Sequence, residues 1–457
     1  MDLKGKKVLV FGAGKSGIGA ADLLGSAGAQ PVIYDGNADL DKEAVLHKTN
    51  GKYTPEIWAG DFPERALDSL DLVVLSPGVP TDLPLVKSFY EKGLPVWSEV
   101  ELAYRTGKGE VLAITGTNGK TTTTALLGKI MGDARESVFV VGNIGTAYTS
   151  KSLEMREDSV TVAEISSFQL ETIHTFHPAV SAILNITPDH LNRHHTMECY
   201  IKTKERIAEN QTEDEVCVLN YEDEVLRAFG ETLHTNVLYF SSRQKLDRGL
   251  YLDGEDIYYA DGENTTKVIN VNELNILGTH NYENVMAATG IALSLGVPMD
   301  KIVEVLKRFQ AVEHRIEYVT EKRGVKFYND SIASSPSRTI AGLRSFDQKI
   351  ILIAGGYDKK IPYEPLAPEV LAHVKTLVLM GATGPRIEKA VRECDGFAGS
   401  GLTILHADSM QHAVELARGA AKPGDVVSLS PASASFDLYP NFEVRGRDYK
   451  NIVKNLK

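Results

Sequence analysis

The chain has 457 residues, of which 43% are hydrophobic and 24% are charged, and this length and composition predict a globular protein of about two to four domains. Its net charge of −12 at pH 7 argues against nucleic acid as a partner, because no excess of basic residues is available to neutralise phosphates. No stretch is long and apolar enough to span a membrane, and the three cysteines are scattered without a CxxC spacing, so we expect a cytoplasmic protein with free thiols and no membrane partner.

The chain begins with the pattern of a nucleotide-binding βαβ unit. Residues 7–11 predict a strand, and the glycine-rich turn GAGKSG follows it and precedes an apolar helix. A second strand over residues 31–34 ends at Asp35, which lies 18 residues after Gly17, where an acid that binds a ribose or a base is expected. NAD and a UDP-sugar both fit this pattern. The alternative is an ordinary glycine-rich turn in which Asp35 caps a loop.

A proline-containing turn follows a later strand of this first domain. Residues 71–75 predict the strand, and Ser76, Pro77 and Gly78 come directly after it. Open α/β sheets bind ligands at the carboxyl ends of their strands, so Ser76 and Gly78 are candidate binding residues. The strand predicted over residues 94–97 ends the domain.

The sequence TGTNGKTTTT, residues 115–124, predicts a phosphate-binding loop between a strand at 109–114 and a helix at 121–131. Its glycines let the backbone approach an anion, and the helix N-terminus faces the phosphates. Lys120 can reach the β- and γ-phosphates, and the Thr121 hydroxyl can bind Mg²⁺. The loop is two residues shorter than the full Walker pattern, because Ile114 stands where that pattern begins with glycine. A threonine-rich surface turn is the alternative to an ATP-like triphosphate site.

Polar residues follow the next strands of this second domain. Glu164 ends the strand predicted from residue 159, where a carboxylate is a good Mg²⁺ ligand. His190 follows the strand predicted over residues 179–184, and its place makes it a candidate although one histidine beside one aspartate is more often structural. Asn281 and Asn284 begin a predicted helix, where they could bind an adenine edge or cap the helix.

The third region again alternates strands and helices. The strands are predicted over residues 325–328, 349–353, 376–379 and 426–429, and each ends in glycine or small polar residues. Such ends are typical of ligand-facing loops in α/β domains.

Taken together, these motifs resemble those of the Mur ligase family, in the family's order and over essentially the whole chain: GAGKSG, TGTNGKTTT, NITPDHLNRH, YIKTKERI, GTHNYENVMAA, EHRIE, YNDSIASSP and SPASASFDLYPNFEVRG. The last stretch is most similar to the branch that adds D-glutamate. The resemblance implies a three-domain α/β fold. Residues 1–98 would form a Rossmann-like UDP-sugar domain, residues 99–311 a central P-loop ATP-binding domain, and residues 312–457 a Rossmann-like domain that binds the amino acid.

The resemblance also implies the reaction. The protein would be a monomeric, cytoplasmic, ATP- and Mg²⁺-dependent ligase that adds D-glutamate to UDP-N-acetylmuramoyl-L-alanine through an acyl phosphate, in peptidoglycan precursor synthesis. Its catalytic residues would be Lys120, His190, Lys204 and Arg315, which with two Mg²⁺ ions offset the negative charge of the substrates.

Individual residues receive roles from the same resemblance. ATP would be bound by Gly116, Thr117, Asn118, Gly119, Lys120, Thr121, Thr122, Asn281, Asn284, Arg315 and Asp330. Mg²⁺ would be held by Thr121, Glu164, His190 and Lys204, with Lys204 at the position of a carbamylated lysine; a solvated lysine on a charged helix face is the alternative. The UDP-sugar would contact Lys15, Ser16, Asp35, Ser76, Gly78 and Asn143. D-glutamate would contact Ser334, Lys359, Ser435 and Phe442.

One motif of this chain departs from the family pattern. The common D-glutamate-branch pattern DSKATN reads DSIASS here, and Ile332 cannot pair with a carboxylate, although Arg338 could supply a substitute charge.

Three rival interpretations of the function are an L-alanine-adding ligase, a nicotinamide-dependent oxidoreductase and a nucleotide-binding regulatory protein without chemistry. Asn118 counts against the first, because that branch usually has histidine there.

Overall fold

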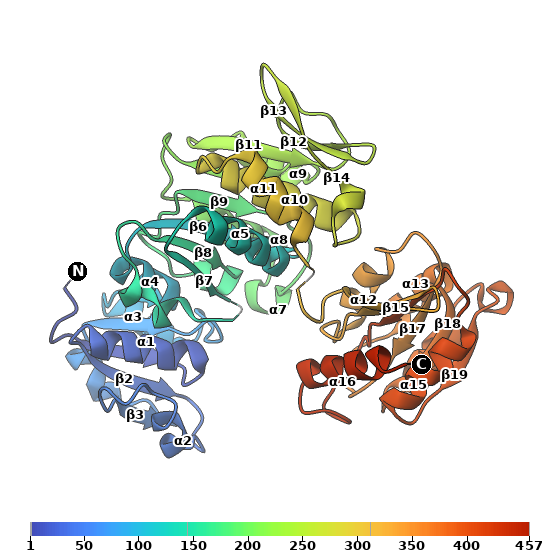
Figure 1. Cartoon of the computed structure of the whole chain (residues 1–457). Coiled ribbons are helices and arrows are strands. Elements are labelled where there is room, and N and C mark those ends of the chain that lie inside the picture. Colours follow the sequence, from blue (N-terminus) through green and yellow to red (C-terminus); the bar gives the residue numbers. More distant parts are fainter. Residues whose placement is uncertain (1, 144, 311, 457) are drawn as a thin grey trace. The chain divides into compact units, whose positions relative to one another are not determined.

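The computed structural model describes residues 2–143, 145–310 and 312–456. Within these residues the strands form three sheets, of five, nine and six strands (Figure 1). The chain divides into two compact units, one made of Met1–Val271 and Tyr282–Leu306 and the other of Asn272–Asn281 and Lys307–Lys457. The first unit holds the five- and nine-stranded sheets, and the second holds the six-stranded sheet. None of the described helices is both long and apolar enough to cross a membrane.

The five-stranded sheet is parallel throughout, in the order β3-β2-β1-β4-β5. This is the strand order of the doubly wound Rossmann sheet without its sixth strand, and the predicted Rossmann-like class is confirmed. Most of its residues are buried, as the apolar runs of the sequence require. The strands are β1 (Lys7–Phe11), β2 (Gln30–Asp35), β3 (Glu56–Ala59), β4 (Leu72–Leu75) and β5 (Val96–Ser98), and the helices are α1 (Lys15–Ser26), α2 (Lys42–Leu46), α3 (Pro84–Glu91) and α4 (Glu99–Thr106).

The nine-stranded sheet has the order β14-β13-β12-β11-β10-β9-β6-β8-β7. Its strands are β6 (Glu110–Thr115), β7 (Val138–Gly142), β8 (Val160–Glu164), β9 (Val180–Ile183), β10 (Val216–Asn220), β11 (Asn236–Ser241), β12 (Arg248–Asp253), β13 (Asp256–Asp261) and β14 (Thr265–Asn270). The helices are α5 (Lys120–Ala134), α6 (Ser167–Leu170), α7 (Leu191–His194), α8 (Met197–Glu205), α9 (Glu224–Gly230), α10 (Thr279–Ser294) and α11 (Met299–Arg308). The strands are parallel except where β13 pairs antiparallel with β12 and β14.

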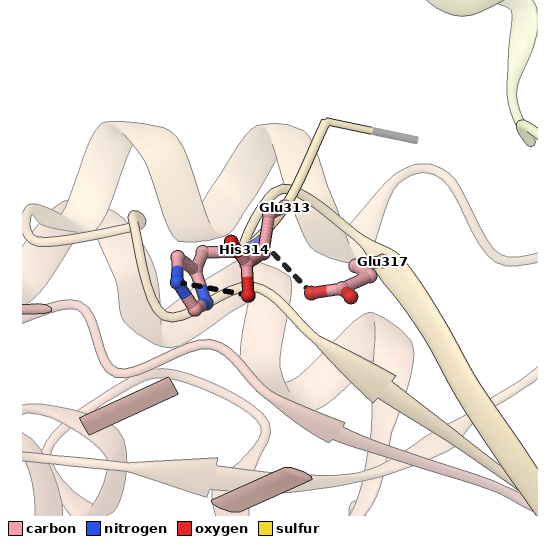
Figure 2. Close-up of side chains that lie close together, drawn as sticks. All are labelled: Glu313, His314 and Glu317. Carbon is pink, nitrogen blue, oxygen red and sulfur yellow. Dashed lines mark hydrogen bonds and ion pairs between the residues drawn. The ribbon is translucent and has the colours of Figure 1, made fainter. Parts of the chain in front are cut away.

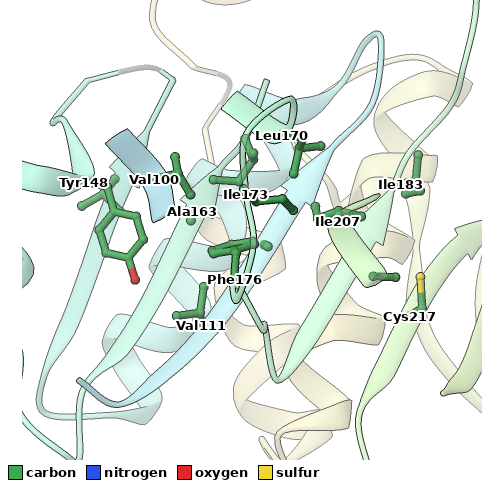
Figure 3. Packing of buried hydrophobic residues seen from close by; sticks show 14 of the residues in the cluster. Val100, Val111, Tyr148, Ala163, Leu170, Ile173, Phe176, Ile183, Ile207 and Cys217 are labelled. Atoms are coloured by element: carbon green, nitrogen blue, oxygen red, sulfur yellow. The ribbon is translucent and has the colours of Figure 1, made fainter. Parts of the chain in front are cut away.

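A hydrophobic core packs against this second sheet (Figure 3). It joins buried side chains of the strands, among them Val111, Ala163 and Ile183, to Leu170 and Phe176 from the segments that cover the sheet. β6 lies between β8 and β9, so that Ile114 pairs with Glu164 on one side and Ala182 on the other. The phosphate loop and the residues after β8 and β9 therefore meet at one sheet edge.

The five- and nine-stranded sheets are linked within the first unit by an ion-paired contact. Arg193 forms an ion pair with Glu171 (2.6 Å) and donates to the carbonyl of Val79 (2.7 Å). Thr81 also donates to Glu171 (3.2 Å). Both partners of the ion pair are 11% exposed, so the link is largely shielded from solvent.

The six-stranded sheet has the order β15-β16-β20-β17-β18-β19, parallel except for the antiparallel pair β15 and β16. Its strands are β15 (Glu317–Lys322), β16 (Val325–Asn329), β17 (Ile350–Ala354), β18 (Val374–Leu379), β19 (Thr403–His406) and β20 (Val426–Leu429), and its helices are α12 (Pro336–Leu343), α13 (Ala367–His373), α14 (Gly384–Arg392), α15 (Met410–Ala420) and α16 (Phe442–Lys454). The loops after β16, β17 and β20 lie at neighbouring strand ends. The predicted domain limits after residues 98 and 311 stay predictions, and residue 311 lies outside the described residues.

Candidate active site

The phosphate loop, residues 116–119, connects β6 to α5. Gly116 (φ 148°) and Gly119 (φ 86°) adopt backbone conformations that side chains rarely tolerate. Thr121, in the first turn of α5, is half-buried, whereas Thr122 is 3% exposed. The first amide groups of a helix have no partner within it, so the N-terminus of α5 offers donors to an anion at this loop.

Two lysines converge on the carbonyl of Gly116. The Nζ of Lys120 donates to the carbonyls of Gly116 (2.7 Å) and Thr117 (3.0 Å), and the Nζ of Lys204 on α8 also donates to Gly116 (2.9 Å). The side chain of Lys204 is buried, with 1% of the residue exposed. Burial, helped by the charge of Lys120 and opposed by Asp189, lowers the pKa of Lys204 well below its ordinary value. The site thus combines a positive field with an amine that loses its proton readily.

The segment after β9 holds the phosphate loop in shape. The Oδ1 of Asn185 accepts from the amide of Asn118 (2.8 Å), and the backbone carbonyl of Asn185 accepts from the amide of Thr117 (2.9 Å). The hydroxyl groups of Thr117 and Tyr200 are hydrogen bonded (3.0 Å). The loop is therefore ordered by contacts from residues far apart in the sequence.

Helix α10 brings Asn284 against the same loop. Its Oδ1 accepts from Thr123 (3.2 Å), and a Cβ placed on Gly119 would collide with its side chain. Asn281 lies one turn earlier, in the second unit, where its Nδ2 donates to the carbonyl of Leu277 (2.7 Å).

Glu164 ends β8 beside the phosphate loop and is 2% exposed. Its Oε1 accepts from the Nδ2 of Asn143 (3.1 Å), and its carbonyl accepts from the Asn143 amide (2.8 Å). The carboxylate oxygens of Glu164 and the hydroxyl of Thr121 are the hard ligands that Mg²⁺ prefers, so this part of the site fits the ion. An ammonium group at Lys204 does not, because a metal ligand needs a lone pair or a negative charge.

His190 precedes α7 with an unusual backbone conformation (φ 52°). Its Nε2 lies 3.5 Å from Asp189, and its ring packs against Phe168 with the centroids 4.9 Å apart. Strained backbone at a strand-end loop is common at functional sites.

His194, which the sequence reasoning did not single out, is buried and also packs against Phe168. The two rings stack with centroids 5.5 Å apart, and the Nε2 of His194 lies 3.0 Å from the hydroxyl of Ser167. Burial, with a smaller contribution from Arg193, lowers the pKa of His194 to about 4. His194 is therefore neutral at pH 7 and acts as a packing and hydrogen-bonding residue.

The glycine-rich turn of the first domain is held by the predicted acid. The Oδ2 of Asp35 accepts from the amide of Ala13 (3.0 Å), and the hydroxyl of Ser76 donates to the carbonyl of Gly12 (3.3 Å). A Cβ on Gly17 would collide with that carbonyl. Asp35 and Ser76 thus shape the turn itself.

Two cavities open near these residues in the first unit. Lys15, an exposed residue at the start of α1, donates to the carbonyl of Gly145 at the rim of a cavity of about 580 Å³. Ser16 follows it and is half-buried. The other cavity has a volume of about 300 Å³. It is lined by Pro77, Gly78, Pro80, Asp82, Phe168, Asn192, Arg193 and His195.

The predicted amino-acid residues of the second unit lie on adjoining loops. Tyr357 pairs with Ala434 through an isolated bridge, which brings the loop that carries Lys359 beside the buried Ser435. The hydroxyl of Ser331 donates to the carbonyl of Phe442 at the start of α16 (2.8 Å).

Other side chains of this region are exposed. Lys359 is exposed, and Ser334 is half-buried on the loop after β16. Arg338 is exposed and its Nη1 donates to the carbonyl of Ile332 (3.3 Å).

Arg445 was missed by the sequence reasoning and holds these loops together. It is 2% exposed, and its guanidinium donates to Ser331 and to the carbonyls of Ser433 (3.1 Å) and Ala434 (3.0 Å). Burial lowers the pKa of Arg445 to about 10, so it keeps its charge at pH 7. The hydrogen-bond partners of Arg445 are neutral, and the nearby charge of Asp437 helps to keep the guanidinium charged.

Asp330 and Arg315 lie on the two loops that flank the β15–β16 pair. Asp330 is 4% exposed, accepts from the hydroxyl of Ser430 (2.7 Å), and has its pKa raised to about 7 by burial. Arg315 lies between His314 and Ile316, whose φ angles are 69° and 45°.

Known proteins match this chain along its whole length. Family models match at residues 6–98 (Mur ligase MurD-like, N-terminal domain), 114–292 (Mur ligase middle domain) and 314–433 (Mur ligase, glutamate ligase domain). A UDP-N-acetylmuramoylalanine–D-glutamate ligase of Lachnospira eligens is 52% identical over 456 residues, which is 100% of both chains. The ligases of that name from Lachnoclostridium phytofermentans and Clostridioides difficile are 50% and 42% identical, again over 100% of both chains.

The chain belongs to the Mur ligase family.

Solved structures agree on the fold of this Mur ligase. The UDP-N-acetylmuramate-alanine ligase MurC of Thermotoga maritima matches with a TM-score of 0.60 at 19% identity, over 99% of this chain and 100% of that one. The MurF ligase of the same organism, solved in complex with ADP, matches with a TM-score of 0.58 at 18% identity, over 99% and 96%. The predicted three-part α/β fold is therefore confirmed.

Proposed function

We propose that this Mur ligase joins the alanine carboxyl group of UDP-N-acetylmuramoyl-L-alanine to the amine of D-glutamate at the expense of ATP. The observation that carries the reaction type is the pair of lysines, Lys120 and Lys204, on one carbonyl of the phosphate loop. The names of the full-length relatives supply the substrates.

The reaction needs activation because a carboxylate is a poor electrophile. The alanine carboxylate attacks the γ-phosphorus of ATP, which forms an acyl phosphate and releases ADP. The amine of D-glutamate then attacks the acyl carbon, so that the amide bond forms, phosphate leaves and the amine loses a proton. The carboxylate, the triphosphate and glutamate all carry negative charge, and their approach is the barrier that the site must lower.

Lys120 is proposed to neutralise the transferred phosphoryl group. In the structure its Nζ is held by two loop carbonyls, which keeps the ammonium at the loop before ATP arrives. Donors placed in advance need no reorganisation during the reaction, and this is the main source of their catalytic effect. Arg315 and Asp330 keep the roles that the family resemblance gives them, as contacts to a phosphate and to the ribose of ATP.

Lys204 is proposed to carry CO₂. Its lowered pKa favours the neutral amine, whose nitrogen attacks the carbon of CO₂ and loses one proton to give a carbamate. That change places an anion at the buried position beside Lys120. With Glu164, Thr121 and His190 the carbamate would hold Mg²⁺, which would supply further charge compensation to the phosphates.

The remaining predicted residues divide between the two substrates. Lys15, Ser16, Asp35, Ser76, Gly78 and Asn143 are proposed to contact the UDP-sugar; Ser334, Lys359, Ser435 and Phe442 are proposed to contact D-glutamate. The buried charge of Arg445 beside these loops supports a dicarboxylic amino acid at the second group. We propose action in the cytoplasm as a monomer.

The test is the release of ADP with substrates left out one at a time. We expect ADP to form at an appreciable rate only when UDP-N-acetylmuramoyl-L-alanine, D-glutamate, ATP and Mg²⁺ are all present, with one amide product per ADP. Turnover with L-alanine and UDP-N-acetylmuramate would favour the L-alanine-adding rival. Hydride transfer to or from NAD, without ADP release, would favour the oxidoreductase.

A further inference from the structure

Glu313, His314 and Glu317 bring their side chains together just before β15 (Figure 2). One ligand-type atom from each lies within 4.8 Å of the others. Two carboxylates and an imidazole at this spacing raise the question of a metal ion, but the neighbouring side chains give a different answer.

A cation from the protein already lies between the two carboxylates. The Nζ of Lys450, on α16, donates to Glu313 (3.1 Å) and to Glu317. Burial opposes the charge of Lys450, but its hydrogen bonds to Glu317 and Glu313 more than compensate and raise its pKa. The side chains of Lys450 and Glu317 are 17% and 16% exposed, so this ion pair is largely shielded from solvent.

The His314 ring has no free nitrogen for a metal ion, because of where its proton lies. The Nδ2 of Asn329 lies 2.9 Å from the Nδ1 of His314 and 3.0 Å from Glu317. A carboxylate only accepts, so Nδ2 is the donor there, and the Nδ1 of His314 accepts its second hydrogen. Burial lowers the pKa of His314 and so favours its neutral form. Its proton is then on Nε2, which faces Glu313 at 3.7 Å and has no lone pair for a metal.

The same cluster fixes the backbone around Arg315. Glu317 accepts from the amide of His314 (2.9 Å), and the carbonyl of His314 accepts from the amide of Ile332 (3.1 Å). The residues on both sides of Arg315 have positive φ angles, 69° at His314 and 45° at Ile316. Such conformations persist only where surrounding contacts over-determine them.

Helix α16 supplies further contacts to the same turn. The rings of Phe442 and His314 meet edge to face with centroids 6.0 Å apart, and a Cβ on Gly446 would collide with the His314 ring. Helix α16 thus contacts the His314 ring through Phe442 and Gly446. It contacts the carboxylates of Glu313 and Glu317 through Lys450.

We propose that Lys450 on the C-terminal helix is a positioning residue for the reaction, which acts through Glu313, Glu317 and His314 to hold the Arg315 turn in its strained conformation. The kinetic consequence rests on the proposed function, because Arg315 is assigned to a phosphate of ATP there. The structural consequence does not, and can be measured in the protein without substrate.

The test compares Lys450→Met and Lys450→Arg with Lys454→Met, which removes an exposed lysine from the last turn of the same helix. In Lys450→Met we expect faster hydrogen exchange at the amides of His314 and Ile332, and kcat/KM for ATP lowered about tenfold with the KM for D-glutamate changed less than twofold. Lys450→Arg should recover most of the loss, and Lys454→Met should match wild type in both measurements.

Unchanged exchange and unchanged ATP kinetics in Lys450→Met would overturn the proposal, as would an equal rise in the KM of every substrate. Equilibrium dialysis with Mn²⁺ in which Glu313→Gln loses one bound ion relative to wild type would also overturn it, because the cluster would then be a metal site. A wild-type protein that does not ligate D-glutamate would contradict the proposed function, while the exchange measurement would still decide the role of Lys450.

Discussion

The phosphate loop of the first unit and the proposed amino-acid-binding loops of the second unit, which carry Lys359 and Ser435, have similar places in their sheets. Their charged side chains differ in burial and in partners. Both regions lie where parallel strands end. At the phosphate loop two lysines converge on one carbonyl, and one of them, Lys204, is almost fully buried. In the amino-acid loops the buried cation, Arg445, is bonded to the protein, and the proposed ligand contact, Lys359, is exposed. In the proposed function, phosphate would therefore meet a lysine already held by two loop carbonyls, whereas the amino acid would meet an exposed lysine.

The largest effect on activity is expected for Lys120, whose ammonium group is held at the phosphate loop. Lys120→Ala should lower kcat by about 10²–10³-fold or more, because a donor placed in advance for the transferred phosphoryl group is removed. Lys129→Ala is the matched control, since Lys129 is an exposed lysine on the same helix. Steady-state ADP release measures both variants, and a Lys120→Ala enzyme with wild-type turnover would show that the phosphate-loop assignment is wrong.

Lys204, the buried lysine of the pair, tests whether this side chain acts as an amine or as a carbamate anion. Lys204→Ala should lose about 10²-fold or more in activity and should recover part of it when a short carboxylic acid such as acetate is added, because the acid restores a negative group. Lys202→Ala removes an exposed lysine of the same helix and should be close to wild type. Mass spectrometry that finds only free amine at Lys204 in active enzyme would count against the carbamate.

Lys359 tests whether the exposed lysine of the second unit contacts D-glutamate. A charge-assisted hydrogen bond to a carboxylate contributes roughly 1.5–3 kcal/mol. Lys359→Met should therefore raise the KM for D-glutamate about 10- to 150-fold and leave the other two KM values little changed. The same three constants in Lys360→Met and Arg338→Met locate the contact, and a D-glutamate effect confined to either of these would move the assignment away from Lys359.

The last effect concerns stability and not activity, and a feature that the two units share, a buried carboxyl group with a raised pKa. Burial raises the pKa of Asp330 in the second unit to about 7 from 3.8. The unfolded chain therefore releases this proton first, and the free energy of unfolding should fall as the pH rises from about 4 to about 7. In Asp330→Asn this contribution is absent, so relative to wild type the variant should gain on the order of 1 kcal/mol for each pH unit between about 4 and about 7.

Glu99 offers the matched variant in the first unit, because burial raises its pKa to about 7 as well. Glu99→Gln should show the same pH-dependent gain in urea unfolding. If neither variant changes the pH dependence, both carboxyl groups are ionised in the native protein and the assigned burial effect is wrong.

Sequence predicted the phosphate loop better than the amino-acid loops for a physical reason. The strand, the phosphate loop and the helix after it are contiguous in the chain, so a local pattern predicts the loop, although residues far away in the sequence hold it in shape. In the second unit, Ser331 and Ser433 are joined by Arg445, and His314 by Asn329 and Lys450. No local spacing encodes such contacts, so these positioning residues could not be found before the fold was known.

The same contrast holds for the folds. The strands predicted from apolar runs followed by glycine or small polar residues are present, including β1, β6 and β20. The meander of β12 to β14 was not predicted, although Gly254 lies in the turn between two of its strands. Its strands mix polar with apolar residues, because much of this edge of the sheet is exposed, and so the apolar-run signal is weak there.

The proposed ligation is tested most directly by following an oxygen atom. UDP-N-acetylmuramoyl-L-alanine labelled with ¹⁸O in the alanine carboxyl group is incubated with ATP, Mg²⁺ and D-glutamate, and the inorganic phosphate is analysed by mass spectrometry. An acyl phosphate passes one carboxyl oxygen to phosphate, so we expect one labelled oxygen in each phosphate released. Phosphate without label, formed in step with the amide product, would contradict the acyl-phosphate account.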